Sequence, residues 1–521
     1  MPQQGPALAE DAIVPLHRIL ERGLARDPEG LAFVSLLTGK SWRNLEEAAT
    51  RYARNLLALG LRPGDRVASL MPNRVALLVH YLGCLKARLV ATPLNYRYMA
   101  PEIDHALEVS GASILLTHVE RAQDLAESKL ANRLPLGRIS YAIEDDGHTH
   151  FSALLKDPPA IDLPVPKPDD PAIIFFTSGS TGKPKGVTHT HETFGRLLAS
   201  IVASFALTPN DRFLPGSSAS HIGGLALSLG AFAAGSCIVG ARSFNGAELL
   251  PLLRLYRPTL LSMLPAALFM LERDHDAKRE DFESLRTVIS GGDKVSQTLE
   301  DEFTRLAGYP IRECFGMSEI GFASLQPAGV PRPGSVGKPV HGYAFSVRDE
   351  RGRELPPGEE GRLWVRSPAN MIGYWNRPDA TKETIVDGWL DSGDVMKVDE
   401  AGFFWFCGRK KQIIVHDGSN ICPQEVEEAV ESHPAVDACG VVGIHDLVHG
   451  ENVRAYVTLK PGAGQVSYQE VITLARSKVG YKAPEDIVVL AEMPLNATGK
   501  VDRVALKRMA EEQEHPADRA A

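Results

Sequence analysis

Short apolar segments alternate with segments of helical periodicity, and this alternation limits the folds open to the chain more than any other feature. Between positions 66 and 117 the pattern predicts three strands (Arg66–Met71, Leu89–Pro93 and Ser113–Thr117) separated by two helices (Val75–Ala87 and Glu102–Val109). Strands that alternate with helices form parallel sheets with helices packed on their faces. The sequence therefore predicts an α/β fold.

The length of 521 residues calls for more than one domain, because single hydrophobic cores stop growing at roughly 250–300 residues. We expect a boundary near Arg409–Gln412, directly after a strand pattern at Gly402–Cys407. Beyond it, a turn at His416–Asn420 and a helix at Pro423–Ser432 begin a second series of strands and helices. That series is long enough for a compact domain of about 100 residues.

Composition excludes several classes of protein. The net charge of −9 argues against general binding to nucleic acid or to anionic membranes. Six cysteines are scattered without a CxxC pair, which favours a reducing compartment over disulfides or a zinc site. No signal-peptide pattern is visible, and no apolar run reaches the roughly 20 residues that span a bilayer. The longest apolar segment, Leu225–Gly240, predicts a buried helix that leads into a strand. We expect a cytoplasmic protein.

The strongest local signal is a loop dense in Gly, Ser and Thr. A strand pattern at Ala172–Phe176 leads into the segment TSGSTGKPKG, residues 177–186. Glycines allow backbone N–H groups to approach an anion, hydroxyls add donors, and lysines add positive charge. The loop is not a Walker motif, because Thr177 stands where the first Gly is required and Pro184 where the hydroxyl is required. The sequence predicts a polyphosphate-binding loop of another kind.

This loop resembles the phosphate-binding signature of the adenylate-forming superfamily, which includes acyl- and aryl-CoA synthetases, luciferase and the adenylation domains of peptide synthetases. Further segments resemble family motifs in the family's order: Phe315–Glu319, Gly388–Asp394, Gly408–Lys411 and Pro494–Arg503. Two further segments, Pro333–Pro339 and Met371–Asn376, also resemble family segments, and we assign them structural or positioning roles only. The pattern is most similar to that of the acyl- and aryl-CoA synthetases.

The resemblance implies a two-domain architecture and a two-step reaction. A large N-terminal domain of parallel-rich sheets, residues 1–408, would be joined by a hinge at 409–412 to a small C-terminal α+β domain, residues 413–521, that rotates. The substrate carboxylate would attack the α-phosphorus of ATP, forming acyl-AMP and pyrophosphate. The thiol of coenzyme A would then take the acyl group. ATP, Mg²⁺ and coenzyme A are the implied small-molecule partners.

The resemblance also assigns roles in nucleotide binding. Phe315 would stack on adenine, and the two oxygens of Asp394 suit the two ribose hydroxyls. Phe315 and Ser318 replace the Tyr and Thr that are usual in the family, and the aromatic face is retained. The complete implied set is Thr177, Ser178, Gly179, Ser180, Thr181, Gly182, Lys185, Gly292, Asp293, Phe315, Gly316, Asp394 and Arg409.

Four residues are implied in catalysis: Lys500, Ser318, Glu319 and His221. Lys500 would bridge the carboxylate and the α-phosphate, the Ser318 hydroxyl would contact the α-phosphate, and Glu319 would hold Mg²⁺, a hard cation that takes oxygen ligands. Lys411 would be the hinge residue, and Gly418 would lie against coenzyme A. Residues 415–418 lack the lysines often found there in aryl-CoA ligases, so the contacts to the phosphopantetheine arm are left open.

The implied acyl pocket consists of His221, Gly223, Gly224, Gly291 and Gly316. His221 would either gate the carboxylate or simply pack as part of the protein. Segments 217–225 and 315–322 contain no Arg or Lys, so a second substrate carboxylate would lack an assured partner. We therefore expect an apolar monocarboxylic acid, either medium-chain aliphatic or aryl.

Other functions stay open at this stage. The acceptor thiol could belong to a carrier protein, as in an acyl-AMP ligase or an adenylation domain. An amino-acid-activating domain would have an Asp soon after Ser220, and none occurs between Pro215 and Gly230. A catalytically inactive nucleotide-binding paralogue is disfavoured because Lys500, Glu319, Asp394 and Arg409 are all present. A monomer and a homodimer are both compatible with the sequence.

Overall fold

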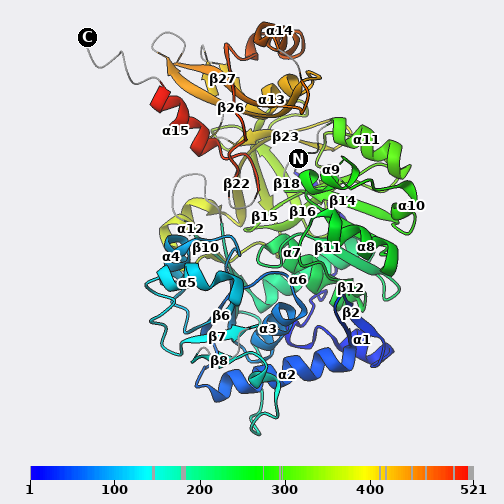
Figure 1. Ribbon diagram of the computed structural model, residues 1–521, viewed down its shortest axis with the longest axis vertical. Coiled ribbons are helices and arrows are strands. Elements are labelled where there is room, and N and C mark those ends of the chain that lie inside the picture. Colours follow the sequence, from blue (N-terminus) through cyan, green and yellow to red (C-terminus); the bar gives the residue numbers. More distant parts are fainter. Residues whose placement is uncertain are drawn as a thin grey trace. The chain divides into compact units, whose positions relative to one another are not determined.

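A computed structural model describes residues 2–142, 147–177, 184–273, 275–292, 295, 297–409, 412, 414–416, 419–446, 450–463, 466–496 and 499–513 (Figure 1). Contacts between residues divide the chain into two compact units. The first comprises Met1–Ser346 and Trp364–Leu390, and the second comprises Val347–Leu363 and Asp391–Ala521. This division follows packing and places residues 391–408 with the second unit. Lys411 lies outside the described residues, so rotation about it stays a prediction.

One sheet of the first unit has eight described strands in the order β20-β10-β9-β5-β4-β6-β7-β8. The strands are β4 (Arg66–Leu70), β5 (Val90–Pro93), β6 (Ile114–His118), β7 (Arg138–Tyr141), β8 (Thr149–His150), β9 (Pro171–Phe176), β10 (Gly186–Thr190) and β20 (Gly373–Tyr374). The helices between them include α3 (Val75–Lys86), α4 (Ala100–Ser110) and α5 (Ala122–Glu127). The predicted alternation of strand and helix is confirmed, and β4 to β9 pair in parallel.

The connections of this sheet reverse direction at β4. The chain leaves β4 through α3 to reach β5 on one side, and it later crosses through α4 to reach β6 on the other side. From β6 it continues away from β4 to β7. Adjacent strands β4 and β6 therefore form a topological switch point. In open parallel sheets, a crevice at the carboxyl ends of the strands lies at such a point.

A second sheet of the first unit has nine described strands in the order β17-β16-β15-β14-β13-β11-β12-β2-β3. They are β2 (Leu31–Val34), β3 (Gly39–Ser41), β11 (Arg212–Gly216), β12 (Cys237–Val239), β13 (Leu260–Met263), β14 (Thr287–Gly291), β15 (Arg312–Met317), β16 (Gly321–Leu325) and β17 (Lys338–Pro339). Helix α7 (Ile222–Ala234) is buried almost all round and is followed by β12, which confirms the buried helix and strand expected from the apolar run.

The other helices of the first unit are α1 (Glu21–Arg26), α2 (Trp42–Ala58), α6 (His191–Ser204), α8 (Gly246–Tyr256), α9 (Pro265–Arg273), α10 (Arg279–Phe282), α11 (Gln297–Ala307) and α12 (Pro378–Thr384). Helices α8, α10 and α11 pack over the second sheet, with Leu252, Phe282 and Phe303 in one apolar core. None of the described helices combines the length and the hydrophobicity needed to traverse a bilayer.

A six-stranded sheet has the order β1-β18-β19-β22-β21, with β23 paired to β22. Its strands are β1 (Gln3–Gln4), β18 (Ala344–Arg348), β19 (Gly361–Arg366), β21 (Ile385–Val386), β22 (Trp389–Val398) and β23 (Phe404–Arg409).

The C-terminal part of the second unit is an α+β arrangement around a largely antiparallel sheet, ordered β25-β24-β27-β26 with β28 beside β27. Its elements are β24 (Ile414–His416), β25 (Ser419–Ile421), α13 (Pro423–Glu431), β26 (Val436–Asp446), β27 (Gly450–Leu459), α14 (Tyr468–Val479), β28 (Asp486–Val489) and α15 (Arg503–Gln513). Val426, Val441, Val453 and Ala475 form part of its apolar core. This arrangement confirms the small α+β domain that was expected.

A buried carboxylate ties together the beginnings of three strands in the nine-stranded sheet. Asp211, just before β11, accepts hydrogen bonds from Thr208 N (2.8 Å), Thr259 Oγ1 (2.7 Å) and Arg286 Nε (2.9 Å). Thr259 precedes β13, and Arg286 precedes β14. Burial alone would raise the pKa of Asp211, but the hydrogen bonds from Arg286, Thr259 and Thr208 outweigh it and the pKa is lowered.

We predict that Asp211→Asn lowers the free energy of unfolding by roughly 1–3 kcal/mol at neutral pH, because hydrogen bonds to a charged acceptor are lost. The folded pKa is lowered, so this stabilisation is complete above the unfolded value of about 3.9 and disappears as the pH falls through the folded value. Urea unfolding at pH 7 and at pH 3 measures the difference from the unmutated chain. Glu47→Gln is the control, since Glu47 pairs with Arg51 at 3.7 Å on the exposed surface. Equal stability of the two variants at pH 7 would contradict the assignment.

Candidate active site

The predicted phosphate loop connects two paired strands. Phe176, at the end of β9, lies opposite Gly186, at the start of β10. Across the mouth of the loop, Thr177 N donates to the carbonyl of Lys185 at 3.2 Å. The strand predicted before the loop is confirmed as β9. Residues Ser178, Gly179, Ser180, Thr181 and Gly182 lie outside the described residues, so their roles stay predictions.

Lys185 and Glu319 meet at one tyrosine. The Nζ atom of Lys185 lies 4.0 Å from the centre of the Tyr374 ring, and the Tyr374 hydroxyl donates to Glu319 Oε1 at 2.9 Å. Strand β20 positions Tyr374 because it pairs with β10, with Tyr374 opposite Val187. Burial, followed by the charge of Glu319, raises the pKa of Tyr374, so its hydroxyl remains a donor. The buried carboxylate of Glu319 is therefore held in a defined orientation by the same tyrosine that the Lys185 cation contacts.

The turn that carries Ser318 and Glu319 is held at its backbone. His189, on β10, donates from Nε2 to the carbonyl of Ser318 at 2.9 Å, and Met371 N donates to the carbonyl of Glu319 at 2.8 Å. Burial lowers the pKa of His189 to about 4, although the hydrogen bond to Ser318 opposes this shift. His189 is therefore neutral at physiological pH and acts here as a fixed donor.

Two glycines implied in the acyl pocket lie where adjacent strands approach closely. A Cβ atom on Gly291 would lie 2.4 Å from the carbonyl oxygen of Cys314, and one on Gly316 would lie 2.1 Å from that of Gly321. The neighbouring Phe315 ring packs edge-on against Phe345, with centroids 6.5 Å apart.

Gly292 has a φ of +84°, a conformation that favours glycine. Asp293 lies outside the described residues.

His221 begins α7 at the end of a structured loop. Its N–H donates to the carbonyl of Ser218 at 3.1 Å. Asn73, which follows β4, holds the same loop, because its Nδ2 donates to the carbonyl of Ser217 at 3.0 Å and its Oδ1 accepts from Ala219 N at 2.8 Å. A Cβ atom on Gly224 would lie 2.2 Å from the carbonyl oxygen of Ser218. The nearest atom to a Cβ on Gly223 would be Phe322 Cζ, at 3.9 Å, so Gly223 leaves space.

The second unit contains the remaining described site residues. Asp394 on β22 is 1% exposed, its N–H donates to Ser392 Oγ at 3.1 Å, and its register partner on β23 is Arg409. Lys500 lies in a compact turn, where its N–H donates to Asn496 Oδ1 at 3.2 Å and its carbonyl accepts from Asn496 N at 2.7 Å. Lys411 and Gly418 lie outside the described residues.

Sequence reasoning missed three residues that position the others. Tyr374 lies in a segment, Met371–Asn376, that had been given only a structural or positioning role. His189 and Asn73 carried no motif of their own, since each acts on a segment more than a hundred residues away in the sequence. The described residues contain no group of three His, Cys, Asp or Glu side chains that could hold a metal ion.

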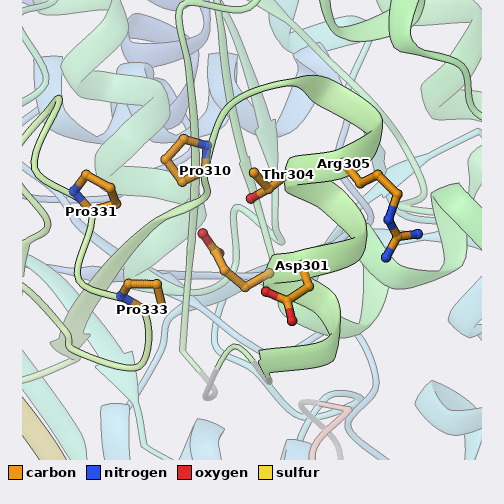
Figure 2. Close-up of a pocket in the computed structure, with 7 residues that line it drawn as sticks. Asp301, Thr304, Arg305, Pro310, Pro331 and Pro333 are labelled. Carbon is orange, nitrogen blue, oxygen red and sulfur yellow. The ribbon is translucent and has the colours of Figure 1, made fainter.

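A pocket of about 490 Å³ on the first unit is separate from the predicted site residues. Figure 2 shows Asp301, Thr304 and Arg305 on α11, with Pro310, Pro331 and Pro333 on the other side of the pocket and Arg305 directed away from the prolines. Glu300, which also lines it, is buried, and burial raises its pKa to about 7. None of the residues implied in nucleotide, acyl or metal binding lines this pocket.

We predict that Gly316→Ala destabilises the first unit whereas Gly223→Ala does not. The added Cβ at position 316 forces β15 away from Gly321, and overpacking of this kind costs about 1–3 kcal/mol. At position 223 the Cβ makes only an ordinary contact, and Ala is favoured over Gly in a helix by about 0.5–1 kcal/mol. Thermal unfolding measures both variants. A Tm for Gly316→Ala equal to that of Gly223→Ala would show that the two strands tolerate the extra atom.

Comparisons with known proteins agree with this arrangement. The family model described as "AMP-binding enzyme" matches residues 20–375, and that described as "AMP-binding enzyme C-terminal domain" matches residues 425–500. A feruloyl-CoA synthase from an Amycolatopsis species is 34% identical over 479 residues, covering 90% of this chain and 94% of the relative. The fatty acid–[acyl-carrier-protein] ligase ScoC from Streptomyces coeruleorubidus is 33% identical over 478 residues, covering 90% and 91%.

Among solved structures, that of ATP-bound MatB from Rhodopseudomonas palustris is similar with a TM-score of 0.87 and 27% identity, covering 95% of this chain and 99% of that chain. The family model extends from residue 20 to residue 375, and the fold and the order of the motifs agree with it. We conclude that this chain belongs to the AMP-binding enzyme family.

Proposed function

We propose that this AMP-binding enzyme is an AMP-forming carboxylate–CoA ligase. It activates a carboxylic acid with ATP, releases pyrophosphate, and transfers the acyl group to coenzyme A. The observation that carries the proposal is the meeting of Lys185 and Glu319 at Tyr374, at the start of β10. A fixed cation and a fixed carboxylate at one point suit a metal-bound polyphosphate. The likeness to a feruloyl-CoA synthase over nine-tenths of the chain supports coenzyme A as the acceptor.

The residues of the first unit account for binding of the nucleotide. Lys185 neutralises the β- and γ-phosphates, Phe315 offers an aromatic face to adenine, and the Ser318 hydroxyl contacts the α-phosphate. Glu319 fits a magnesium ligand, because it is a buried oxygen donor oriented by Tyr374. Mg²⁺ bound there would offset charge on the triphosphate. The chemistry of the carboxylate supports this assignment.

The residues of the second unit account for the ribose and for the chemical step. Asp394 and its register partner Arg409 bind the ribose hydroxyls. In the first step, an oxygen of the substrate carboxylate bonds to the α-phosphorus, and the bond between that phosphorus and pyrophosphate breaks. Lys500 neutralises charge on the carboxylate and the α-phosphate during this step. In the second step, the sulfur of coenzyme A bonds to the acyl carbon, and AMP leaves with the electron pair of the broken C–O bond. Rotation about Lys411 and placement of Gly418 against coenzyme A belong to this proposal.

A carrier-protein thiol is the alternative acceptor. The observation in its favour is the 33% identity to ScoC, a fatty acid–[acyl-carrier-protein] ligase. Both acceptors carry the same phosphopantetheine thiol. The experiment therefore supplies pre-formed acyl-AMP and compares the rate of acyl transfer to coenzyme A with the rate of transfer to a phosphopantetheinylated carrier protein. A faster reaction with the carrier would replace coenzyme A in the proposal.

We predict that Lys500→Ala separates the two half-reactions. Loss of one charge-stabilising donor should reduce acid-dependent pyrophosphate release by about 10²–10³-fold. Thioester formation from purified acyl-adenylate and coenzyme A should remain within a few-fold of the unmutated enzyme, because Lys500 acts only while charge develops at the α-phosphate. Lys507→Ala serves as the control, since Lys507 is an exposed lysine of α15 whose partner is Glu451 at 3.4 Å. Equal loss of both half-reactions in folded Lys500→Ala would contradict this role.

We predict that the substrate is an apolar monocarboxylic acid, aryl or medium-chain aliphatic. Gly223 leaves space that Phe322 borders, and an apolar acyl group suits such a wall. A screen of pyrophosphate release tests the prediction and the ligase activity together. It covers aryl acids, aliphatic acids of increasing length, dicarboxylic acids and amino acids, each with and without coenzyme A. An α-amino acid or a short dicarboxylate preferred over every apolar acid would refute it.

A further inference from the structure

A basic and aromatic cluster lies at the switch point of the eight-stranded sheet, apart from the residues assigned above. Arg74 follows β4, His118 ends β6, and Tyr141 ends β7. Because β4, β6 and β7 are parallel, these residues share the carboxyl edge of the sheet. In open α/β sheets, ligands bind outside the carboxyl ends of the strands beside such a switch point.

Arg74 carries a positive charge that the described residues leave unpaired. No described residue forms a hydrogen bond or an ion pair with its guanidinium group, and its Nε is shielded from solvent without an acceptor. The centre of the Tyr141 ring lies 6.0 Å from its central carbon. The two arginines nearby differ, because Arg121 pairs with Asp124 at 3.0 Å and Arg242 pairs with Glu120. Arg74 is therefore the arginine of the cluster whose positive charge no described carboxylate neutralises.

His118 adds a second donor without an acceptor. The residue is 3% exposed, and its Nδ1 accepts a hydrogen bond from Glu120 N at 3.2 Å. The proton of the neutral ring is therefore on Nε2, and Nε2 is buried with no partner among the described residues. Burial, followed by the charges of Arg74 and Arg242, lowers the pKa of His118 to about 4. The imidazole stays neutral and offers an N–H group.

The hydroxyl of Tyr96 is under the influence of the same arginines. Burial raises the pKa of Tyr96, and the charges of Arg121, Arg242 and Arg74 all oppose that shift. The same hydroxyl donates to Glu120 Oε2 at 2.6 Å, so the acidic groups of the cluster are already engaged. Buried donors without acceptors are costly, and each one calls for a specific explanation.

We propose that Arg74 and His118 form a binding site for an oxyanion, either a phosphate or a carboxylate, carried by a small molecule. A guanidinium group presents paired donors to both anions, and the Nε2–H of His118 adds one more. Asn73, the residue before Arg74, holds the loop of Ser217 and Ala219 that leads to His221. The oxyanion therefore has two sources to distinguish: free phosphate, and a distal carboxylate on an acid bound near that loop.

The test measures anion binding to the full chain without turnover, so its result is independent of the proposed ligase activity. Inorganic phosphate is titrated at constant ionic strength, and mass spectrometry follows the modification of Arg74 by phenylglyoxal, an arginine-directed dicarbonyl. We expect phosphate to slow modification of Arg74 at least fivefold while leaving that of Arg51, an exposed helix arginine, unchanged. Adipate and hexanoate, matched in length, are compared in the same assay. Protection by phosphate without protection by adipate assigns the site to a phosphate. Protection by adipate without protection by hexanoate assigns it to a distal carboxylate, and a dicarboxylic acid would then replace the monocarboxylic acid predicted above as the substrate.

Variants link the effect to the cluster. Phosphate binding, followed by the rise in Tm, should weaken at least tenfold in Arg74→Gln, persist in part in Arg74→Lys, and remain unchanged in Arg51→Gln. His118→Phe keeps the ring stacked on Tyr141 and removes the donor, and it should weaken binding several-fold. The chemical-modification assay uses the unmutated chain, so it decides the matter even where a variant fails to fold. Equal modification of Arg74 with and without phosphate and adipate would overturn the proposal.

Discussion

A carboxylate that is removed from water has to be hydrogen-bonded, and Glu319 meets this requirement through the hydroxyl of Tyr374. The constraint organises its surroundings. Tyr374 reaches Glu319 because β20 pairs with β10, and β10 is also the strand that follows the phosphate loop. The Tyr374 ring in turn lies beside the Lys185 cation. Loop, lysine, tyrosine and carboxylate are therefore linked by one set of strand pairings, which lets a short stretch of sheet define a site for a charged ligand.

Most described residues that the family motifs assign to the first unit lie at strand ends or in the turns that follow them. Thr177 follows β9, Lys185 precedes β10, Gly291 ends β14, and the turn of Ser318 and Glu319 joins β15 to β16. The strands fix the backbone, and the turns carry the chemistry. His189 and Met371 each donate to one carbonyl of that turn, so neither Ser318 nor Glu319 depends on its own short segment for position. The proposed oxyanion site follows the same principle at the switch point of the eight-stranded sheet.

Several features of the fold were predictable because they depend on neighbours in the chain. The strands and helices between residues 66 and 117, the buried helix α7 with β12, and the α+β character of the C-terminal part all follow from apolar periodicity, which acts over a few residues. The family followed from motif order. His189 and Asn73 were not predicted as positioning residues, and the positioning role given to segment 371–376 did not identify Glu319 as the partner of Tyr374. A hydrogen-bond partner more than 50 residues away leaves no local pattern. The space around the glycines of the implied acyl pocket likewise depends on the tertiary structure. A Cβ atom at Gly316 would meet a backbone carbonyl, and one at Gly223 would make only an ordinary contact.

The sequence by itself determined the class of fold, the family and the identity of the residues that the motifs name, because each depends on residue types at fixed spacing along the chain. Only the tertiary structure decided which of those residues meet, since strand pairing sets the distance between Lys185 and Tyr374 and between Asn73 and the His221 loop. It also decided which charges are compensated. The sequence does not distinguish the three arginines of the cluster from one another. In the structure, Arg121 and Arg242 have carboxylate partners, and Arg74 has none among the described residues. Charge compensation depends on proximity in space, and the chain order does not contain that information.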